Sequence, residues 1–419
     1  MELTRNGWKR VVITGMGAVT PLGRFPAFWD RLKRGESGIR RIQSFDASDL
    51  EVQIAGEVID FDPNEYLDPK ESRRMARASQ FGVTAALDAL ADSGMTLSDL
   101  EPIQDRVGVD FGSSMGGHDL AQQASFGYRT RGRRPGPFLL IQSLPNIPAH
   151  YISKITGALG PLVCLSTACA TGTHSIGDGL DMIRHGRADV VFAGGTEAML
   201  FDYAIAGFIS MTALATGYND APEKSSRPFD LHRNGFVFGE GAGVLILETL
   251  ERAVKRGARI YGEVVGMSTS SDAYHIAAPD PNGRGAQNAM KWALQDAGLN
   301  PQEIDYINAH GTSTKANDVI ETNAIKKVFG EHAYDIMVNS TKSMIGHLLG
   351  GAGAVEGIAS VMSLYERVLH PTINYETPDP ECDLDYVPNE ARQVSKLRYA
   401  LSNSFGLGGQ NACVIFGSV

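Results

Sequence analysis

Short apolar segments rich in β-branched residues alternate along the whole chain with stretches of helical periodicity. Apolar strands without inward–outward alternation are typical of parallel or mixed sheets that helices cover on both faces. The pattern therefore predicts an α/β protein. The expected strands are residues 10–15, 107–112, 162–167, 190–195 and 244–248 in the first part of the chain, and 304–308, 336–339, 399–403 and 413–416 in the second.

Two of the helical stretches share their sequence and their place in this alternation. Residues 89–95 read ALADSGM and residues 293–299 read ALQDAGL, an offset of 204 residues. In each stretch the glycine is placed to end the helix, and a strand follows within about 15 residues. We interpret the pair as a weak internal duplication of one α/β unit. The expected halves are residues 1–255 and 256–419, with the boundary at a charged helix.

The segment 113–143 lacks a clear hydrophobic periodicity and is expected to be rich in loops. It contains a cluster of positive charge, formed by Arg129, Arg131, Arg133 and Arg134. A solvated loop and a docking patch are both open interpretations of this cluster.

Composition excludes several classes of function. The 419 residues include 38 Lys and Arg against 48 Asp and Glu, a formal net charge of −10, which disfavours nucleic-acid or membrane binding through bulk charge. No apolar run reaches the roughly 20 residues of a membrane span, and the first residues do not resemble a signal peptide. The four cysteines lack metal-ligand spacing and are too few for a disulfide scaffold. We therefore expect a cytoplasmic protein with no nucleic-acid partner and no membrane partner.

Cys169 is the first candidate for chemistry. It lies in STACATG at residues 166–172, between an expected strand and an expected helix. At a helix N-terminus, unpaired N–H groups and the helix dipole favour a thiolate, and the residue's own N–H can stabilise an oxyanion. A buried structural cysteine is the alternative, and Cys164, within the apolar strand, fits that alternative.

His310 and His347 follow expected strands and are surrounded by small residues. Such surroundings let a substrate approach the backbone closely. A cysteine with two histidines could bind a metal, but separations of 141 and 37 residues carry no metal signature. We therefore favour acid–base or oxyanion roles over zinc.

Five sequence blocks carry a resemblance to a known family. They are VVITGMGAVTPLG at 11–23, STACATG at 166–172, NAHGTST at 308–314, TKSMIGHLLGGAGAVE at 341–356 and SNSFGLGGQNA at 402–412. With these blocks the chain resembles the β-ketoacyl-acyl carrier protein synthases, the decarboxylating condensing enzymes of the thiolase superfamily. Synthase II and the ketosynthase subunits of type II polyketide assembly are the most similar members. The resemblance implies the five-layered αβαβα thiolase fold, built from two duplicated halves.

The resemblance also implies a ping-pong reaction in fatty acid or polyketide biosynthesis. Cys169 takes an acyl group from the 4′-phosphopantetheine arm of acyl carrier protein, malonyl-carrier protein loses CO2, and the resulting carbanion attacks the thioester. The backbone N–H groups of Cys169 and Leu407 are implied to stabilise the thioester oxyanion. Nε2 of His310 and of His347 is implied to stabilise the enolate. No metal and no redox cofactor is implied.

Supporting residues follow from the same resemblance. Lys342 and Glu356 are implied to form a buried pair that holds the histidines, and Glu321 is implied to belong to the same polar network. Thr312 and Thr314 match the hydroxyls that bind the pantetheine amides.

Some positions depart from the family pattern around the acyl pocket. The family loop Phe-Gly-Phe-Gly-Gly reads here Phe405-Gly-Leu407-Gly-Gly, so the gate residue that covers the cysteine is smaller. A relaxed gate that accepts bulkier or less saturated acyl chains is one interpretation, and neutral variation is the other. Ala277 replaces a threonine of the pantetheine channel. Met115 and Leu139 stand where the family shapes the far end of the acyl tunnel.

Other functional classes remain open at this stage. A biosynthetic thiolase would need a second catalytic cysteine, but Cys413, the only candidate, lies in an apolar strand and is interpreted as core. A non-catalytic chain-length-factor subunit would lack the nucleophile, whereas Cys169 is present. Between pathways, fatty acid elongation is the first choice and a specialised polyketide or polyene pathway is the alternative.

The resemblance implies protein partners as well. Acyl carrier proteins are acidic, so a local basic rim is expected near the substrate channel. The candidates are the arginine cluster at 129–134 and a second cluster of Lys70, Arg73 and Arg74. A homodimer is expected, with a heterodimer containing a chain-length-factor-like subunit as the alternative.

Overall fold

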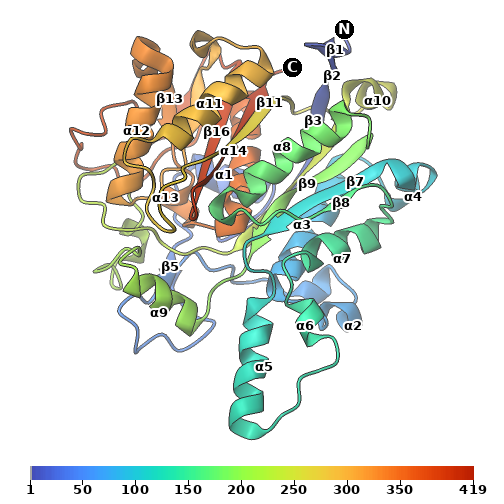
Figure 1. The fold of residues 1–419 in the computed structure, drawn as a ribbon, viewed down its shortest axis with the longest axis vertical. Coiled ribbons are helices and arrows are strands. Elements are labelled where there is room, and N and C mark those ends of the chain that lie inside the picture. The colour runs from blue at the N-terminus through green and yellow to red at the C-terminus, as the bar shows by residue number, and fades with distance from the viewer. Residues whose placement is uncertain (1) are drawn as a thin grey trace.

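A mixed sheet of 11 strands organises the computed structural model, which describes residues 2–419 (Figure 1). One run of strands belongs to the first part of the chain and a second run belongs to the rest. The first run is β8 (Leu162–Val163), β7 (Val107–Ser113), β9 (Val190–Glu197), β10 (Gly241–Thr249) and β3 (Val11–Thr20), with β4 (Gly23–Arg24) added to β3. The second run is β13 (Met337–Asn339), β12 (Tyr306–Asn308), β16 (Tyr399–Gly406), β17 (Gln410–Gly417) and β11 (Gly262–Ser271).

The two runs have the same order and the same directions. In each run, three parallel strands are followed by two antiparallel ones. A short antiparallel pairing of β11 with β3, from Gly262 opposite Ile13 to Val264 opposite Val11, joins the runs. The duplication inferred from two short helical stretches therefore extends to the whole strand topology. The exact halves, 1–255 and 256–419, stay a prediction.

Helices form three layers around the two runs of strands. The helices α3 (Arg77–Asp92) and α7 (Ile147–Thr156) cover the outer face of the first run, and α11 (Arg284–Ala297) packs on the outer face of the second beside α12 (Lys315–Phe329). Between the runs lie α8 (Thr171–Arg184) and α14 (Ala352–Glu366), which contact strands of both. Because α14 is enclosed on all sides, its residues from Ala352 to Leu364 are buried. The layers confirm the predicted thiolase-like αβαβα arrangement.

Shorter elements connect these layers. The helices are α1 (Ala27–Lys33), α2 (Pro69–Ser72), α4 (Leu97–Leu100), α5 (His118–Arg131), α6 (Leu139–Gln142), α9 (Asp202–Ser210), α10 (Leu250–Lys255) and α13 (Lys342–Ile345). The strands are β1 (Thr4–Arg5), β2 (Trp8–Lys9), β5 (Arg40–Arg41), β6 (Ile54–Ala55), β14 (Val368–Leu369) and β15 (Arg392–Gln393). No helix of residues 2–419 is long and apolar enough to cross a membrane.

Two expectations about local structure need correction. The segment 113–143 is not mainly loop, because α5 occupies 14 of its residues and α6 another 4, and α5 projects from the body (Figure 1). No residue of α5 is buried, so the helix has no apolar stripe by which the sequence could reveal it. The strand expected at 162–167 ends at Val163, because the chain turns away from the sheet before Cys169.

The paired glycines that suggested the duplication do end their helices. Gly94 follows α3 with φ of 73°, and Gly298 follows α11 with φ of 67°. Both lie in the left-handed region, where a side chain on Cα is strained.

Candidate active site

Cys169 lies in a single 3₁₀ turn, Ala168–Ala170, that leads directly into α8. Ala168 has a positive φ of 50°, which is uncommon for a residue with a side chain. Its carbonyl oxygen accepts hydrogen bonds from the hydroxyls of Ser114 (3.0 Å) and Thr171 (2.7 Å). These contacts hold the strained turn, which sets Cys169 at the N-terminus of the buried helix.

Two histidines meet this cysteine from the second half of the sheet. His310 follows β12, and His347 follows α13. The sulfur and one nitrogen of each imidazole lie within 4.8 Å of one another, and all three side chains are buried. The imidazole rings are nearly perpendicular, with centroids 5.4 Å apart. The three residues singled out in the sequence therefore form one cluster.

The cluster opens into a cavity of about 550 Å³. This volume lies in the range of small-molecule sites. Met115 and Leu139 are not among its lining residues, so the predicted far end of the acyl tunnel lies outside the cavity of the single chain. Of the predicted site residues, the cavity is lined by Cys169, Ala277, His310, Thr312, Thr314, His347, Phe405 and Leu407.

The hydrogen bonds of His347 define which of its nitrogens carries the proton. The backbone N–H of Leu349 donates to Nδ1 at 3.2 Å, so Nδ1 is the acceptor and the neutral ring carries its proton on Nε2. Within residues 2–419, neither Nε2 of His347 nor Nδ1 of His310 has a hydrogen-bond partner, although both atoms are buried. Unpartnered buried polar atoms are costly. A ligand in the cavity would satisfy Nε2 of His347.

Burial lowers the pKa of both histidines well below its usual value, and the positive charge of Lys342 lowers it further. The rings are therefore neutral near neutral pH. A neutral imidazole donates one hydrogen bond without bringing a full charge into the cavity.

The charge state of Cys169 differs from the expectation of a favoured thiolate. Burial raises the pKa of its thiol to about 11, although the backbone N–H of Leu407 and the charge of Lys342 act in the opposite direction. Loss of solvent therefore outweighs the position at the helix N-terminus. In the resting site, a neutral thiol faces neutral imidazoles.

Lys342 and Glu356 form an ion pair behind the cluster, with each side chain 1% exposed. Lys342 begins α13, and Glu356 lies in the buried α14. No hydrogen bond joins Lys342 to either histidine in the described chain. Its influence on the histidines is therefore electrostatic, whereas the resemblance implied that the pair holds them.

Glu321, on α12, fixes the backbone that carries His310. Its carboxylate accepts hydrogen bonds from the N–H groups of His310 and Gly311, each at 2.8 Å, and from the side-chain amide of Asn403 at 3.1 Å. Burial raises the pKa of Glu321 to about 7, and these donors counteract part of the rise. Asn403 was not singled out in the sequence analysis, although it lies in the block 402–412.

Glu197 is a second residue that the sequence analysis missed. It ends β9 and is buried, and its carboxylate accepts the backbone N–H groups of Ser114 (2.9 Å), Met115 (3.3 Å) and Gly350 (3.3 Å). It thereby ties the segment beside the Cys169 turn to the segment that follows His347. An acidic residue at the end of a continuous apolar strand was the available signal.

The threonines predicted to bind pantetheine lie on the cavity wall. The hydroxyls of Thr312 and Thr314 are 3.0 Å apart, and Thr314 caps the N-terminus of α12. The cysteines interpreted as structural lie elsewhere: Cys413 is fully buried in β17, where its thiol donates to Asn403, and Cys164 donates to the carbonyl of Pro145.

Comparisons with known proteins identify the family. Residues 8–253 match the model of the beta-ketoacyl synthase N-terminal domain, and residues 261–376 match that of the C-terminal domain. The chain belongs to the β-ketoacyl synthase family. It is 48% identical over 410 residues to 3-oxoacyl-[acyl-carrier-protein] synthase 2 of Synechocystis, with 97% of this chain and 98% of the relative covered. The enzyme of the same name from Staphylococcus aureus is 46% identical over the same coverage.

Solved structures show the same fold. A ketosynthase in complex with its type II polyketide acyl-carrier protein has a TM-score of 0.90 and 34% identity, covering 98% of this chain and 100% of that chain. A β-ketoacyl synthase from Burkholderia phymatum also has a TM-score of 0.90, with 37% identity and coverage of 98% and 99%. The predicted thiolase-like fold and the predicted class, a condensing acyltransferase, are confirmed.

Proposed function

We propose that this β-ketoacyl synthase condenses malonyl-acyl carrier protein with an acyl chain carried on Cys169. The observation that carries this proposal is the cluster of one sulfur and two imidazoles within 4.8 Å in a buried cavity. A nucleophile and two neutral hydrogen-bond donors are the groups that acyl transfer and decarboxylation require.

In the first step, the sulfur of Cys169 attacks the incoming acyl thioester. A bond forms between this sulfur and the acyl carbon, the bond to the pantetheine sulfur breaks, and the thiol proton passes to the leaving pantetheine sulfur. The backbone N–H of Leu407 lies close enough to the cysteine sulfur to lower the pKa of the thiol. Together with the N–H of Cys169, it would donate to the oxyanion on the acyl carbon.

In the second step, the malonyl group loses CO2. The electron pair of the breaking C–C bond moves into an enolate, whose oxygen accepts hydrogen bonds from His310 and His347. The enolate carbon then attacks the acyl carbon on Cys169, the bond from that carbon to the cysteine sulfur breaks, and the departing thiolate takes a proton from water to restore the neutral thiol. The low pKa of both histidines supports this role, because neutral rings donate without giving up their protons permanently.

We also propose that catalysis uses no metal and no redox cofactor, and that the substrate arrives on 4′-phosphopantetheine. The three clustered groups are near enough to ligate an ion, but acyl transfer and decarboxylation need only a nucleophile and hydrogen-bond donors, which these groups supply themselves. Dialysis of the enzyme against a chelator should leave condensation unchanged. Loss of activity that zinc restores would overturn this part of the proposal.

The proposed partner is acyl carrier protein, bound through one of the two basic clusters. One structural relative was solved with its own carrier protein. In this chain, the first cluster lies at the exposed end of α5 and in the loop after it, and the second lies on and after α2. Charge reversal in the docking cluster should raise KM for the carrier steeply and leave small thioester substrates unaffected. If neither cluster responds, the docking surface lies elsewhere.

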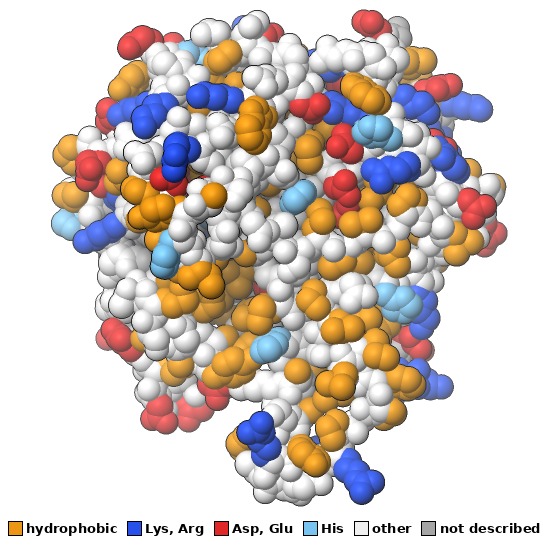
Figure 2. Space-filling model, viewed as in Figure 1, with side chains coloured by type: hydrophobic (Ala, Val, Ile, Leu, Met, Phe, Trp, Pro, Cys, Tyr) orange, Lys and Arg blue, Asp and Glu red, His pale blue; other side chains and the backbone are white. Residues whose placement is uncertain are grey.

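We propose a homodimer, in which α5 and α6 take part in the contact. Exposed apolar side chains gather on these helices and the loop between them: Phe126 (60% exposed), Phe138 (61%) and Leu140 (77%) (Figure 2). Large exposed apolar patches mark interaction sites. Light scattering should give twice the chain mass of 45.0 kDa. A heterodimer with a chain-length-factor-like subunit is the alternative, and it would leave the isolated chain monomeric.

Among pathways, we propose fatty acid elongation in the cytoplasm. The relatives named synthase 2 are 46–48% identical, whereas the polyketide ketosynthase bound to its carrier protein is 34% identical. A polyketide or polyene ketosynthase is the second candidate.

Mass spectrometry of the enzyme incubated with acyl-carrier protein tests the proposed function. We expect one acyl adduct on Cys169 and CO2 release when malonyl-carrier protein follows. A thiolase would form product without CO2 release, and a non-catalytic partner would give neither signal.

A further inference from the structure

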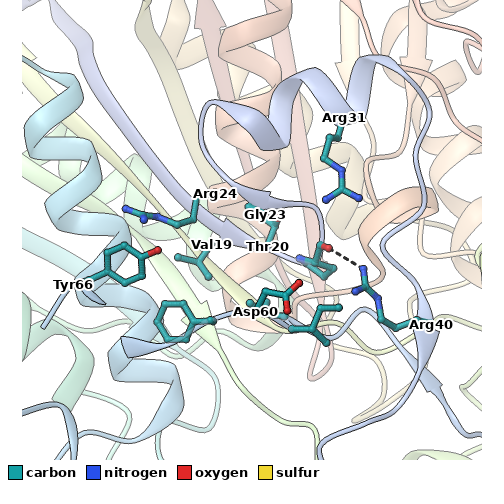
Figure 3. A pocket seen from close by; sticks show the side chains of 12 residues that line it. Val19, Thr20, Gly23, Arg24, Arg31, Arg40, Asp60 and Tyr66 are labelled. Carbon is teal, nitrogen blue, oxygen red and sulfur yellow. Dashed lines mark hydrogen bonds between the residues drawn. The ribbon is translucent and has the colours of Figure 1, made fainter. Parts of the chain in front are cut away.

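A second cavity lies apart from the active site and shares no lining residue with it (Figure 3). It has a volume of about 320 Å³, at the end of β3 beside β4 and α1. The segment 58–66 closes its other side. Its lining is Val19, Thr20, Pro21, Gly23, Arg24, Arg31, Arg40, Val58, Ile59, Asp60, Phe61 and Tyr66.

Two of the three arginines in this lining have carboxylate partners. Arg24 forms an ion pair with Asp88 and covers the ring of Tyr66, 3.9 Å from its centroid. Nε of Arg31 donates to Glu36 at 2.6 Å, and Nη1 donates to the carbonyl of a neighbouring loop at 3.1 Å. These contacts leave Nη2 of Arg31 without a protein partner in the described chain.

Arg40 has no carboxylate partner within ion-pair distance in residues 2–419. Its Nε and Nη2 donate to the carbonyl oxygens of Gly38 and Pro21, both at 3.2 Å, and Figure 3 shows the bond to Pro21. Burial lowers the pKa of Arg40, and the charge of Arg31 lowers it further. Two guanidinium groups therefore repel each other beside a partly enclosed space. An anion between them would relieve this repulsion.

The acidic groups near Arg40 offset its repulsion from Arg31 only in part. Asp60, the only acidic residue in the lining, is exposed, and the carboxylate of Glu57 accepts the backbone N–H of Gln43 at 2.8 Å. Their charges partly offset that of Arg31 on Arg40. Figure 3 shows Arg31 and Arg40 on one side of the cavity, and Arg24 with Tyr66 on the other.

We propose that this cavity binds a small oxyanion, a carboxylate or a phosphate, between the guanidinium groups of Arg31 and Arg40. Nη2 of Arg31 and Nη1 of Arg40, which make no hydrogen bond within residues 2–419, would each donate to an oxygen of such a group. The apolar wall of Val19, Val58 and Phe61 limits the ligand to a compact one. This site goes beyond the proposed condensing function and does not depend on it.

Calorimetric titration of the full-length enzyme, alkylated at Cys169, with sodium phosphate and separately with sodium malonate tests the proposal. Sodium chloride at matched ionic strength is the blank. We expect saturable binding of at least one oxyanion, weakened at least tenfold in Arg40→Gln. Binding of phosphate alone identifies a phosphate site, and binding of malonate alone identifies a carboxylate site.

The matched control is Arg41→Gln. Arg41 is the neighbour of Arg40 on β5, but it pairs with the exposed Asp220 and does not line the cavity. This variant should bind as the wild type does. Arg31→Gln should weaken binding as well, and it carries the test if Arg40→Gln fails to fold. No binding of either oxyanion to the wild type, or binding as tight as the wild type in both cavity variants, overturns the proposal.

Discussion

At the scale of single residues, Cys169 and the two histidines meet in their neutral forms. Burial penalises thiolate and imidazolium alike, so the site holds no resting ion pair among these three groups. Proton transfer must then accompany attack on the thioester rather than precede it. The positive charge of Lys342 shifts the equilibrium between the neutral and charged forms of these three groups. Glu356 holds the ammonium of Lys342 in place.

The thiol of Cys169 should accordingly react slowly with alkylating reagents, and its reaction rate should reach no plateau near neutral pH. With a pKa of about 11, the thiolate fraction at pH 8 is about one thousandth. The rate at which iodoacetamide alkylates Cys169, measured by peptide mass spectrometry from pH 6 to pH 10, should increase throughout this range. A plateau with a midpoint near pH 7 would instead indicate a thiolate–imidazolium pair.

Glu321→Gln should damage decarboxylation through the backbone of His310. Glutamine has one acceptor oxygen where the carboxylate has two, and these two accept four N–H donors, so the His310 loop loses a fixed partner. We expect CO2 release to fall by about 10- to 100-fold, while self-acylation of Cys169 persists. The exposed Glu331→Gln is the matched control, and an equal effect in both variants would contradict a positioning role.

At the scale of elements, the crossing of α8 and α14 brings the nucleophile close to the Lys342–Glu356 pair. A side chain at Gly353 would place its Cβ 2.5 Å from the backbone nitrogen of Thr173, and one at Gly172 would lie 2.5 Å from that of Ala354. The two helices therefore approach with backbone against backbone, which only glycine permits at these positions.

Gly353→Ala should separate these helices and destabilise the enzyme by about 1–3 kcal/mol, the usual cost of overpacking. The free energy of unfolding, measured in urea, checks this value. Gly207→Ala is the control, because Gly207 lies inside α9 with no atom within 4 Å of a new Cβ. That change should be neutral or stabilising by up to about 1 kcal/mol. Equal stabilities for the two variants would show that the crossing tolerates a methyl group.

The loop that carries Leu407 is held by a second loop. The N–H of Gly408 donates to the carbonyl of Ile276, and the N–H of Asp272 donates to that of Gly409, both at 2.9 Å. Leu407→Phe should narrow the acyl range, because a planar ring covers the cysteine more completely than leucine does. Self-acylation rates across short, long and polyunsaturated acyl-carrier substrates check this. An unchanged profile would leave Leu407 as neutral variation.

Sequence periodicity predicted those helices and strands in which buried apolar residues recur at regular intervals. The two predicted helical stretches lie at the ends of α3 and α11, each of which has a buried apolar face, whereas α5 buries no residue and its segment was predicted to be rich in loops. Cys169 was recognised by its place between an expected strand and an expected helix, and His310 and His347 by the small residues around them. Glu197 was missed, because its three backbone donors come from segments far apart in the sequence.

At the scale of the whole molecule, the two runs of strands share one topology but contribute different residues to the active site. Both runs of strands share one order, but Cys169 comes from the first run and the histidines from the second. Exposed arginines and apolar side chains on α5 have no symmetric counterpart in this pattern. Their partners were expected from the family resemblance alone, because exposed residues leave no periodic signal.

The central claim is that Cys169 carries the acyl chain while the histidines carry decarboxylation. The most direct measurement is CO2 release from malonyl-carrier protein by Cys169→Gln and His310→Ala, assayed in parallel with condensation and self-acylation. Cys169→Gln should lose condensation yet release CO2 as fast as the wild type or faster, and His310→Ala should self-acylate but release no CO2. Loss of both activities in a folded Cys169→Gln enzyme would contradict the division of roles.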